Sequence, residues 1–283
     1  MLPDPVINHL RHVINAPDLS NTRYEVLEEI GRGGMGVVYM AHDPELGRKV
    51  AVKVLNSAEE ARILAFLEHP GIVPVHDSGM LPDGRLYYVM KFVEGVRLDA
   101  YRATASLLED RLRTFVRICE PLAFAHSRGV IHRDLKPQNV MIGPFGEVLV
   151  LDWGVARHLG ASTVTAAGTQ GYMAPEQREG ITDIRTDVFS LGKVLEFLLD
   201  PRSAKPVRAI ATKACQHDPQ ARYASVAELA ADVTRYLDGQ RVLAHRESVF
   251  ELVRRWLAGN KTLTLLILTY LLVRAAIFLF MRH

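Results

Sequence analysis

A glycine pattern near the start of the chain suits the binding of phosphate groups. Gly31, Gly33 and Gly36 lie in the string GRGGMGVV, between two segments that alternate apolar and polar residues. A glycine-rich hairpin lets its backbone approach a phosphate closely, whereas a dinucleotide-binding fold would continue into a helix. Lys53 follows in the next alternating segment, where its ammonium group would reach phosphates held under the hairpin. Taken alone, a lysine on a strand is most simply a solvated side chain.

A second group of polar residues lies in the middle of the chain. The string IHRDLKPQN contains Asp134 and ends at Asn139, and the triplets DWG, which begins at Asp152, and APE follow it. Three polar groups around buried strands require a ligand or a metal to offset their loss of water. The sequence therefore predicts that Asp134, Asn139 and Asp152 bind one.

The glycine-rich loop, the strand lysine, the HRDLKPxN loop, the DFG-like triplet and APE occur here in one order. Together they resemble the eukaryotic-type (Hanks-type) protein kinase superfamily, in its bacterial serine/threonine branch, from about residue 24 to residue 237. The resemblance implies an α+β fold of two lobes, a small β-rich N-lobe and a larger α-helical C-lobe. It also implies transfer of the ATP γ-phosphate to serine and threonine hydroxyls of proteins, with Mg²⁺ as cofactor and Mn²⁺ as the alternative.

The same resemblance implies a role for each motif residue. Lys53 is expected to bind the α- and β-phosphates and to be held by Glu60, while Asp134 orients the substrate hydroxyl and accepts its proton. Lys136 is expected to neutralise the γ-phosphate. The remaining residues expected around the nucleotide are Gly31, Gly33, Gly34, Gly36, Val38, Ala51, Met90, Lys91, Val93 and Met141.

The resemblance also implies a metal site and a regulatory loop. Asn139, in the catalytic loop, and Asp152 are expected to hold Mg²⁺ through oxygen atoms. Arg133 precedes the catalytic aspartate, and such an arginine can pair with a phosphate on the loop between DWG and APE. The candidates for autophosphorylation there are Ser162, Thr163 and Thr165.

The hydrophobic pattern predicts the elements that carry these motifs. Residues 24–55 read as three antiparallel strands, residues 57–68 as a helix that Ser57 caps, and residues 72–75 and 86–90 as further strands. In that reading Glu60 has an alternative role as the partner of Ser57 in a capping box. After residues 91–95 the pattern becomes helical. The later elements expected are helices at 110–127, 186–199, 207–216 and 226–237 and a strand at 148–151.

Two departures from the family pattern leave other functions open. Only six residues separate Lys53 from Glu60, and the segment 200–206 follows the preceding helix almost directly, where the family usually has a docking helix. A pseudokinase, which binds nucleotide or acts as a scaffold without catalysis, is therefore the alternative to an active kinase. The missing docking helix also suits a kinase-like enzyme that acts on a small molecule.

The C-terminal part of the chain has the composition of a membrane anchor. Residues 263–280 are 18 residues with one charge, Arg274, and about 17 to 20 apolar residues span a bilayer. Arg254, Arg255 and Lys261 precede this run, which places the catalytic body in the cytoplasm. We expect a single-pass protein of the cell inner membrane, with a homodimer for phosphorylation in trans. A buried C-terminal helix is the alternative.

Charge and domain limits complete the prediction. The chain has 283 residues with 34 Lys and Arg against 32 Asp and Glu, so a nucleic-acid partner is not expected. The expected divisions are an N-terminal extension at 1–22, the N-lobe at 23–93, the C-lobe at 94–240, a basic juxtamembrane segment at 241–262 and a transmembrane helix at 263–280.

Overall fold

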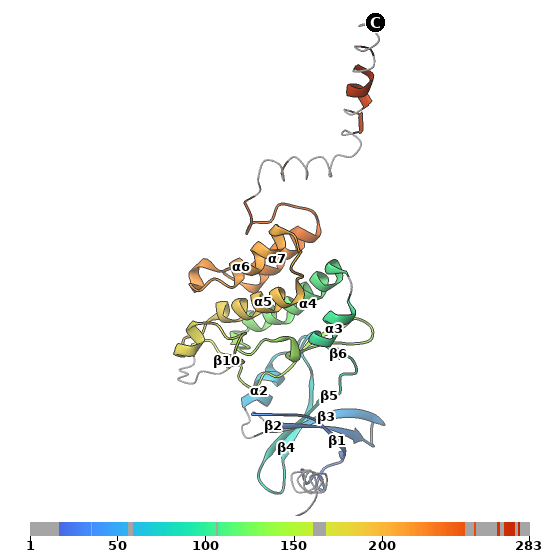
Figure 1. The fold of residues 1–283 in the computed structure, drawn as a ribbon. Coiled ribbons are helices and arrows are strands. Elements are labelled where there is room, and N and C mark those ends of the chain that lie inside the picture. Colours follow the sequence, from blue (N-terminus) through green and yellow to red (C-terminus); the bar gives the residue numbers. More distant parts are fainter. Residues whose placement is uncertain are drawn as a thin grey trace, which may run out of the picture.

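The chain folds into a lobe built on a β-sheet and a lobe built from helices, which lie one above the other in Figure 1. This confirms the expected two-lobed α+β architecture. The computed structural model describes residues 17–34, 36–55, 59–105, 107–160, 168–246, 252, 265–266, 269–274 and 277. The expected cap Ser57 and the candidates Ser162, Thr163 and Thr165 lie outside these residues, as does most of the expected N-terminal extension.

The first lobe contains a five-stranded antiparallel sheet in the order β1-β2-β3-β5-β4. Its strands are β1 (Glu25–Gly33), β2 (Gly36–Asp43), β3 (Arg48–Leu55), β4 (Val75–Met80) and β5 (Leu86–Lys91). The three strands expected within residues 24–55 are confirmed. Helix α2 (Glu59–Phe66) covers one face of this sheet, between β3 and β4 in the chain.

The strand expected at residues 72–75 is wrong in its position. β4 begins at Val75 because Pro74, which has no amide hydrogen, cannot continue a ladder of hydrogen bonds. The carbonyl of Pro74 accepts a bond from the amide of Lys91 instead. Ile72 forms an isolated parallel bridge with Val150, which connects this segment to the second lobe.

Both faces of the sheet are covered, which explains why β3 is buried from Val50 to Leu55. One apolar cluster includes Leu55, Tyr88 and residues of α2 and continues into the helical lobe. A second cluster on the other face includes Tyr39, Val52 and Tyr87. Alternate residues of a strand project to opposite faces, so neighbouring residues of β3 and β5 enter different clusters.

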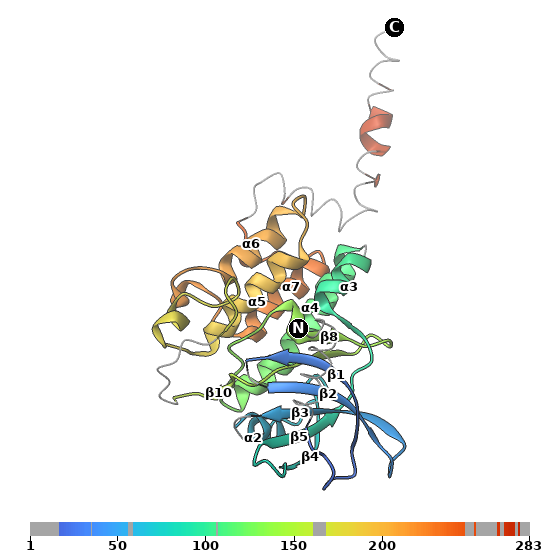
Figure 2. The same cartoon turned by 60° about the horizontal axis from the view of Figure 1, so that its bottom comes forward.

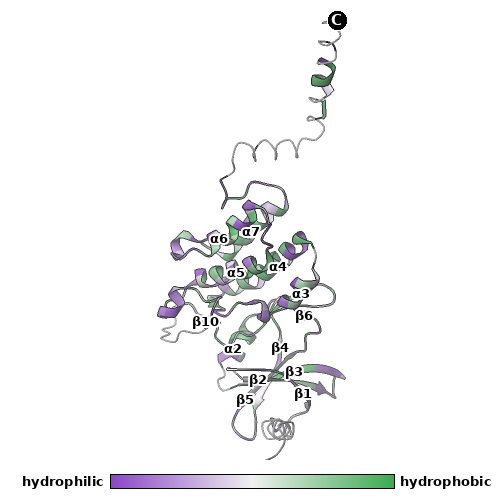
Figure 3. Ribbon diagram, in the orientation of Figure 1, coloured by the Kyte–Doolittle hydropathy of each residue, from purple (hydrophilic) through white to green (hydrophobic). Residues whose placement is uncertain are grey.

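The second lobe packs five helices around a common core. They are α3 (Leu98–Thr104), α4 (Leu108–Ser127), α5 (Ile184–Leu198), α6 (Lys205–Ala214) and α7 (Val226–Leu237). Hydrophobic and hydrophilic segments alternate along α4, α5 and α7 in Figure 3, as expected for helices with one buried face. α5 leads to α6 through residues 199–204, so the described chain has no docking helix between them.

Short strands position the segments that lie between the lobes. β6 (Val96–Arg97), β8 (Val140–Ile142) and β9 (Val148–Val150) form one small sheet, and β7 (Val130–Ile131) pairs with β10 (Arg157–His158). Figure 2 shows β8 and β10 on the side of the helical lobe that faces the large sheet. Apart from β9, these strands were not expected, because two or three residues show no period in the sequence.

The expected membrane span lies largely outside the described residues. Among the parts of the chain that the structure describes, no helix is long and apolar enough to cross a membrane. The described side chains in residues 265–277 include Leu265, Leu266, Leu271, Leu272 and Ile277, and each of these is more than half exposed.

Candidate active site

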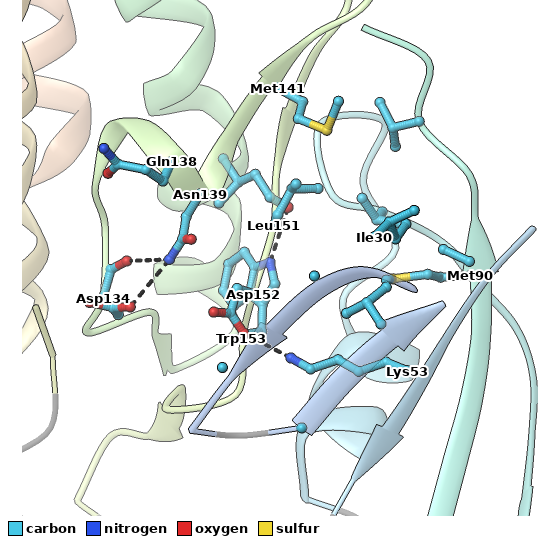
Figure 4. Close-up of a pocket in the computed structure, with 18 of the residues that line it drawn as sticks. Ile30, Lys53, Met90, Asp134, Gln138, Asn139, Met141, Leu151, Asp152 and Trp153 are labelled. Carbon is cyan, nitrogen blue, oxygen red and sulfur yellow. Dashed lines mark hydrogen bonds and ion pairs between the residues drawn. The ribbon is translucent and has the colours of Figure 1, made fainter. Parts of the chain in front are cut away.

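A cleft of about 550 Å³ lies between the two lobes. Figure 4 shows side chains from the sheet on one side of it and from the segments around β8 and β9 on the other. Apart from Glu60, the structure places every residue predicted for the catalytic, nucleotide or metal site in its lining. These residues are Gly31, Gly33, Gly34, Gly36, Val38, Ala51, Lys53, Met90, Lys91, Val93, Asp134, Lys136, Asn139, Met141 and Asp152.

Lys53 lies at the centre of a buried ion cluster that joins three elements. Its Nζ atom is 2.7 Å from Oε1 of Glu60 and 2.8 Å from Oδ1 of Asp152 (Figure 4 shows the second contact). Lys53 comes from β3, Glu60 from the first turn of α2, and Asp152 from the segment after β9. Glu60 therefore reaches the site through Lys53, as predicted for the ion pair.

The pKa values in this cluster follow from burial and from the neighbouring charges. Burial raises the pKa of Glu60 above its ordinary value, and the Lys53 charge reduces this rise without cancelling it. Burial also acts to raise the pKa of Asp152, but the Lys53 charge and hydrogen bond outweigh it and lower that pKa. Burial acts to lower the pKa of Lys53, but Glu60 and Asp152 raise it above its ordinary value. An ammonium group is thus kept charged inside the cleft.

Two residues near the cleft have an uncommon backbone conformation. Asp152 has φ +57° and Arg133 has φ +72°, the two positive values among described residues other than glycine. Such conformations cost of the order of 1–3 kcal/mol each and persist where the surroundings enforce them. At Arg133 the enforcing contacts come from Asp187, whose carboxylate accepts hydrogen bonds from the amides of His132 and Arg133 at 2.8 and 2.9 Å.

Asp134 lies at the floor of the cleft with both carboxylate oxygens engaged. Oδ1 accepts bonds of 2.7 Å from the amide and from the hydroxyl of Thr169. Oδ2 accepts a 2.9 Å bond from Lys136 Nζ and a 3.3 Å bond from Asn139 Nδ2. Asn139 Nδ2 also donates to the Asp134 carbonyl at 2.8 Å (Figure 4). These contacts fix the orientation of a carboxylate that is itself buried.

The residues expected to hold a cation suit magnesium. Asn139 uses its amide nitrogen toward Asp134, so its amide oxygen remains an acceptor, and Asp152 contributes a carboxylate (Figure 4). Such hard oxygen donors fit Mg²⁺, which binds through few protein groups and completes its shell with phosphates and water. Within the described ranges, no group of three or more His, Cys, Asp or Glu could hold a metal ion by itself.

Apolar side chains from both lobes form the other end of the cleft. Val38 and Ala51 come from β2 and β3, Met90 from the end of β5 and Met141 from β8. Figure 4 shows Met90 and Met141 on opposite sides of this part of the cleft. An apolar slot between two surfaces suits a flat ring system such as a nucleobase.

The glycines of the β1–β2 hairpin differ in the space around them. Gly36 has φ +147°, and a Cβ atom there would lie 2.1 Å from the carbonyl oxygen of Val54, so no other residue fits. At Gly33 and Gly34 a Cβ atom would meet nothing within 4 Å. Gly36 is therefore required by the close approach of β2 to β3, whereas the positions of Gly33 and Gly34 have open space around them.

Several lining residues were missed from the sequence. They include Ile30, Leu64, Val73, Tyr88, Arg97, Gln138 and Leu151. Ile30 and Gln138 adjoin predicted residues, and strand alternation would place Tyr88 on the same face as Met90. Leu64 and Val73 had no local signal, because only packing brings them to the cleft.

The protein kinase domain family matches residues 24–249. The two lobes and the cleft between them agree with this match, and the chain belongs to the protein kinase family. The resemblance seen in the motifs is thereby confirmed.

Named relatives come from several bacteria. The chain is 33% identical to the serine/threonine-protein kinase PknD of Protochlamydia amoebophila, over 77% of this chain and 30% of that protein. It is 36% identical to a probable serine/threonine-protein kinase of Streptomyces coelicolor, over 78% of this chain and 41% of that protein. It is 34% identical to PknD of Chlamydia felis, over 77% of this chain and 31% of that protein. The chain thus spans well under half the length of each of these relatives.

Proposed function

We propose that this chain is an ATP- and Mg²⁺-dependent serine/threonine protein kinase, which transfers the γ-phosphate of ATP to protein serine and threonine hydroxyls. One observation carries the proposal. Lys53 and Asp152 line the same cleft as the Asp134–Lys136 pair, and Glu60 holds Lys53 from behind this lining. Phosphoryl transfer depends mainly on positioning and on charge neutralisation, which are the properties of such a cleft.

Each group then has a specific task. Lys53 binds the α- and β-phosphates and Glu60 holds its ammonium group in place. Asp134 orients the substrate hydroxyl and accepts its proton, and Lys136 stabilises the charge on the γ-phosphate. The adenine lies between Val38, Ala51 and Met141, next to Met90, with backbone groups of Lys91 to Val93 at its edge.

Two residues hold the cofactor in this proposal. Asn139 and Asp152 coordinate Mg²⁺, whose charge would neutralise the phosphate oxygens during transfer. The Lys53 contact on Oδ1 of Asp152 orients this carboxylate before the cation arrives. Mn²⁺ satisfies the same oxygen donors and is the alternative ion.

Labelled ATP distinguishes this function from the alternatives. The detergent-purified chain is incubated with γ-labelled ATP, Mg²⁺ and a generic protein substrate, with Asp134→Asn as the control variant. We expect label on serine and threonine, and a loss of about 10²–10⁴-fold in Asp134→Asn because the proton acceptor is removed. ATP binding without transfer would identify a pseudokinase. ATP consumption in the presence of cell metabolites, without labelled protein, would identify a small-molecule kinase.

We also propose autophosphorylation on Ser162, Thr163 or Thr165. Support comes from Arg133. Burial lowers the pKa of its guanidinium group, and the positive charge of the neighbouring Arg157 lowers it further. A phosphate placed near these two guanidinium groups would relieve their repulsion. Mass spectrometry of the active protein should find phosphate within residues 162–165. Full activity in a variant with all three residues replaced by alanine would contradict the proposal.

We propose further that residues 263–280 cross the cell inner membrane once and anchor the protein there. The kinase lobes at 23–93 and 94–240 then lie in the cytoplasm. The basic juxtamembrane segment at 241–262 gives this orientation, and ATP is a cytoplasmic substrate. The exposed apolar side chains of Leu265, Leu271 and Leu272 are consistent with a lipid environment. Residues 1–22 are an extension of the N-lobe.

Confinement to the membrane would raise the encounter rate of two copies of the kinase domain and favour phosphorylation in trans. A truncation after Asn260 tests both parts of this proposal. Full-length protein that is released by carbonate without detergent would contradict the anchor. Loop phosphorylation at equal rates in the truncated and anchored forms, at equal copy number, would contradict the effect of proximity.

A further inference from the structure

Tyr88 is a buried residue of β5 to which the roles above assign no task. Its side chain is 1% exposed, and its hydroxyl donates a 2.9 Å hydrogen bond to Oε1 of Glu60. The same oxygen accepts the 2.7 Å bond from Lys53 Nζ. One carboxylate oxygen of Glu60 is therefore held by two donors from two different strands.

The register of the sheet places these two donors side by side. Lys53 on β3 pairs directly with Tyr88 on β5, so both side chains project from the same face of the sheet, toward α2. Tyr87, the preceding residue, projects to the other face and packs in the second apolar cluster. The Tyr88 ring is held in the first cluster, so the position of its hydroxyl is fixed by packing.

Helix α2 needs such a contact because it is short and Glu60 lies near its start. The helix runs over Glu59–Phe66, so Glu60 is its second residue. Amides of a first helical turn have no partner within the helix, and short helices depend on tertiary contacts for their stability. The orientation of Glu60 is therefore set less by the helix than by the groups that bind its carboxylate.

The charges around Glu60 leave a distinct role for a neutral donor. From the elements packed against it, Lys53 on β3 favours the ionised carboxylate and Asp152 after β9 disfavours it. Burial holds the pKa of Tyr88 well above its ordinary range, so its hydroxyl keeps its proton and remains a donor. Tyr88 thus binds Glu60 without adding a second positive charge that would compete with Lys53 for the carboxylate.

We propose that Tyr88 is a positioning residue, which holds the Glu60 carboxylate toward Lys53 and so aligns the Lys53 ammonium group in the cleft. The proposal rests on the phosphoryl-transfer function proposed above and identifies a further residue on which that function depends. Tyr88 acts through Glu60 and does not itself contact the reacting groups.

Tyr88→Phe tests the role because it removes one oxygen atom and keeps the ring. Tyr87→Phe is the matched control, since it makes the same change at the preceding residue of the same strand but on the opposite face. We expect kcat for phosphoryl transfer to fall about tenfold in Tyr88→Phe, the effect of losing a hydrogen bond to a charged group, and to stay within about twofold in Tyr87→Phe.

A double-mutant cycle separates positioning from a general structural effect. In the Glu60→Gln background, Tyr88→Phe should lower kcat by less than about twofold, because the carboxylate through which Tyr88 acts is absent. An equal fall in both backgrounds would show that Tyr88 acts independently of Glu60 and would overturn the proposal.

Hydrogen exchange gives a readout that does not depend on catalysis. Amides of α2 should exchange faster in Tyr88→Phe than in the wild type, while those of α4 stay unchanged, because only α2 loses a tether. Unchanged exchange in α2 would overturn the role of Tyr88 even in a protein that transfers no phosphate. A wild-type protein that binds ATP without transfer would contradict the proposed function alone.

Discussion

Arg222 and Glu176 form a bidentate ion pair inside the helical lobe. Nη1 and Nη2 of Arg222 lie 2.7 Å from Oε1 and Oε2 of Glu176, respectively. The Arg222 side chain has no exposed surface, and its guanidinium group also donates to the carbonyls of Arg185, Gln216 and His217. The pair therefore ties the APE triplet to the segment between α6 and α7.

We expect Arg222→Ala to lower the free energy of unfolding by about 3–5 kcal/mol, because Glu176 keeps a largely buried charge without its partner. Urea denaturation of the purified protein measures this change. Arg178→Ala is the control, since Arg178 is exposed and lies two residues from Glu176 in the chain. A loss of less than about 1 kcal/mol for Arg222→Ala would contradict the structural role of the pair.

Lys53→Met should reduce phosphoryl transfer by about 10²–10³-fold while weakening nucleotide binding much less. The substitution removes the charge that compensates Glu60 and Asp152 and orients the phosphates. Initial rates with labelled ATP give the first effect, and titration with a fluorescent nucleotide gives the second. Autophosphorylation near the wild-type rate would show that Lys53 does not have the assigned role.

Asp187 should make the stability of the protein sensitive to acid. Burial acts to raise the pKa of Asp187, but the hydrogen bond and charge of His126, together with His132, lower it below its ordinary value of 3.8. A lowered pKa stabilises the folded state above about pH 4, and this contribution is lost as the pH falls through the folded-state pKa.

The free energy of unfolding should therefore decrease more steeply below about pH 4 in the wild type than in Asp187→Asn, which cannot ionise. Urea midpoints measured from pH 3 to pH 7 provide the comparison. Asp187→Asn will be less stable at neutral pH, so the slope with pH is the informative quantity. Identical slopes in the two proteins would rule out a contribution from this carboxylate.

Asp232 should anchor the chain that follows α7. Its buried carboxylate accepts bonds from the Tyr223 hydroxyl at 2.8 Å and from the amides of Leu243 and Ala244 at 2.7 and 3.0 Å. We expect Asp232→Ala to destabilise the protein by about 1–3 kcal/mol and to speed limited proteolysis after Gly239. Asp238→Ala, a change at an exposed position nearby, is the control. Equal cleavage rates in all three proteins would show that the anchor is absent.

The motifs predicted the composition of the site better than its geometry. The order of the glycine loop, Lys53, Asp134, Asn139 and Asp152 was enough to predict the two lobes and the residues of the cleft. The motifs left two roles open for Glu60, an ion pair with Lys53 or a helix cap with Ser57, because both need a glutamate at the start of a helix. Only the approach of β3 to α2 decided that the Glu60 carboxylate faces Lys53.

Local patterns also predicted the larger elements. Strands β1, β2 and β3 and helix α7 agree with expectation because alternation and helical period extend over many residues there. The position of β4 was wrong, since the apolar residues before Pro74 enter the core without pairing as a strand. Short strands such as β7 and β10 form only by pairing with each other, so neither could be predicted from its own residues.

The type and order of the motif residues were enough to recognise the family and to predict the residue types in the cleft, since these depend on which groups are present and in what order. Tertiary structure alone decided that Tyr88 meets Glu60 and that Asp232 accepts hydrogen bonds from the amides of Leu243 and Ala244. Those partners are separated by 28, 11 and 12 residues in the chain. Contacts at such separations form because packing within each lobe brings the segments together, and no local pattern records them.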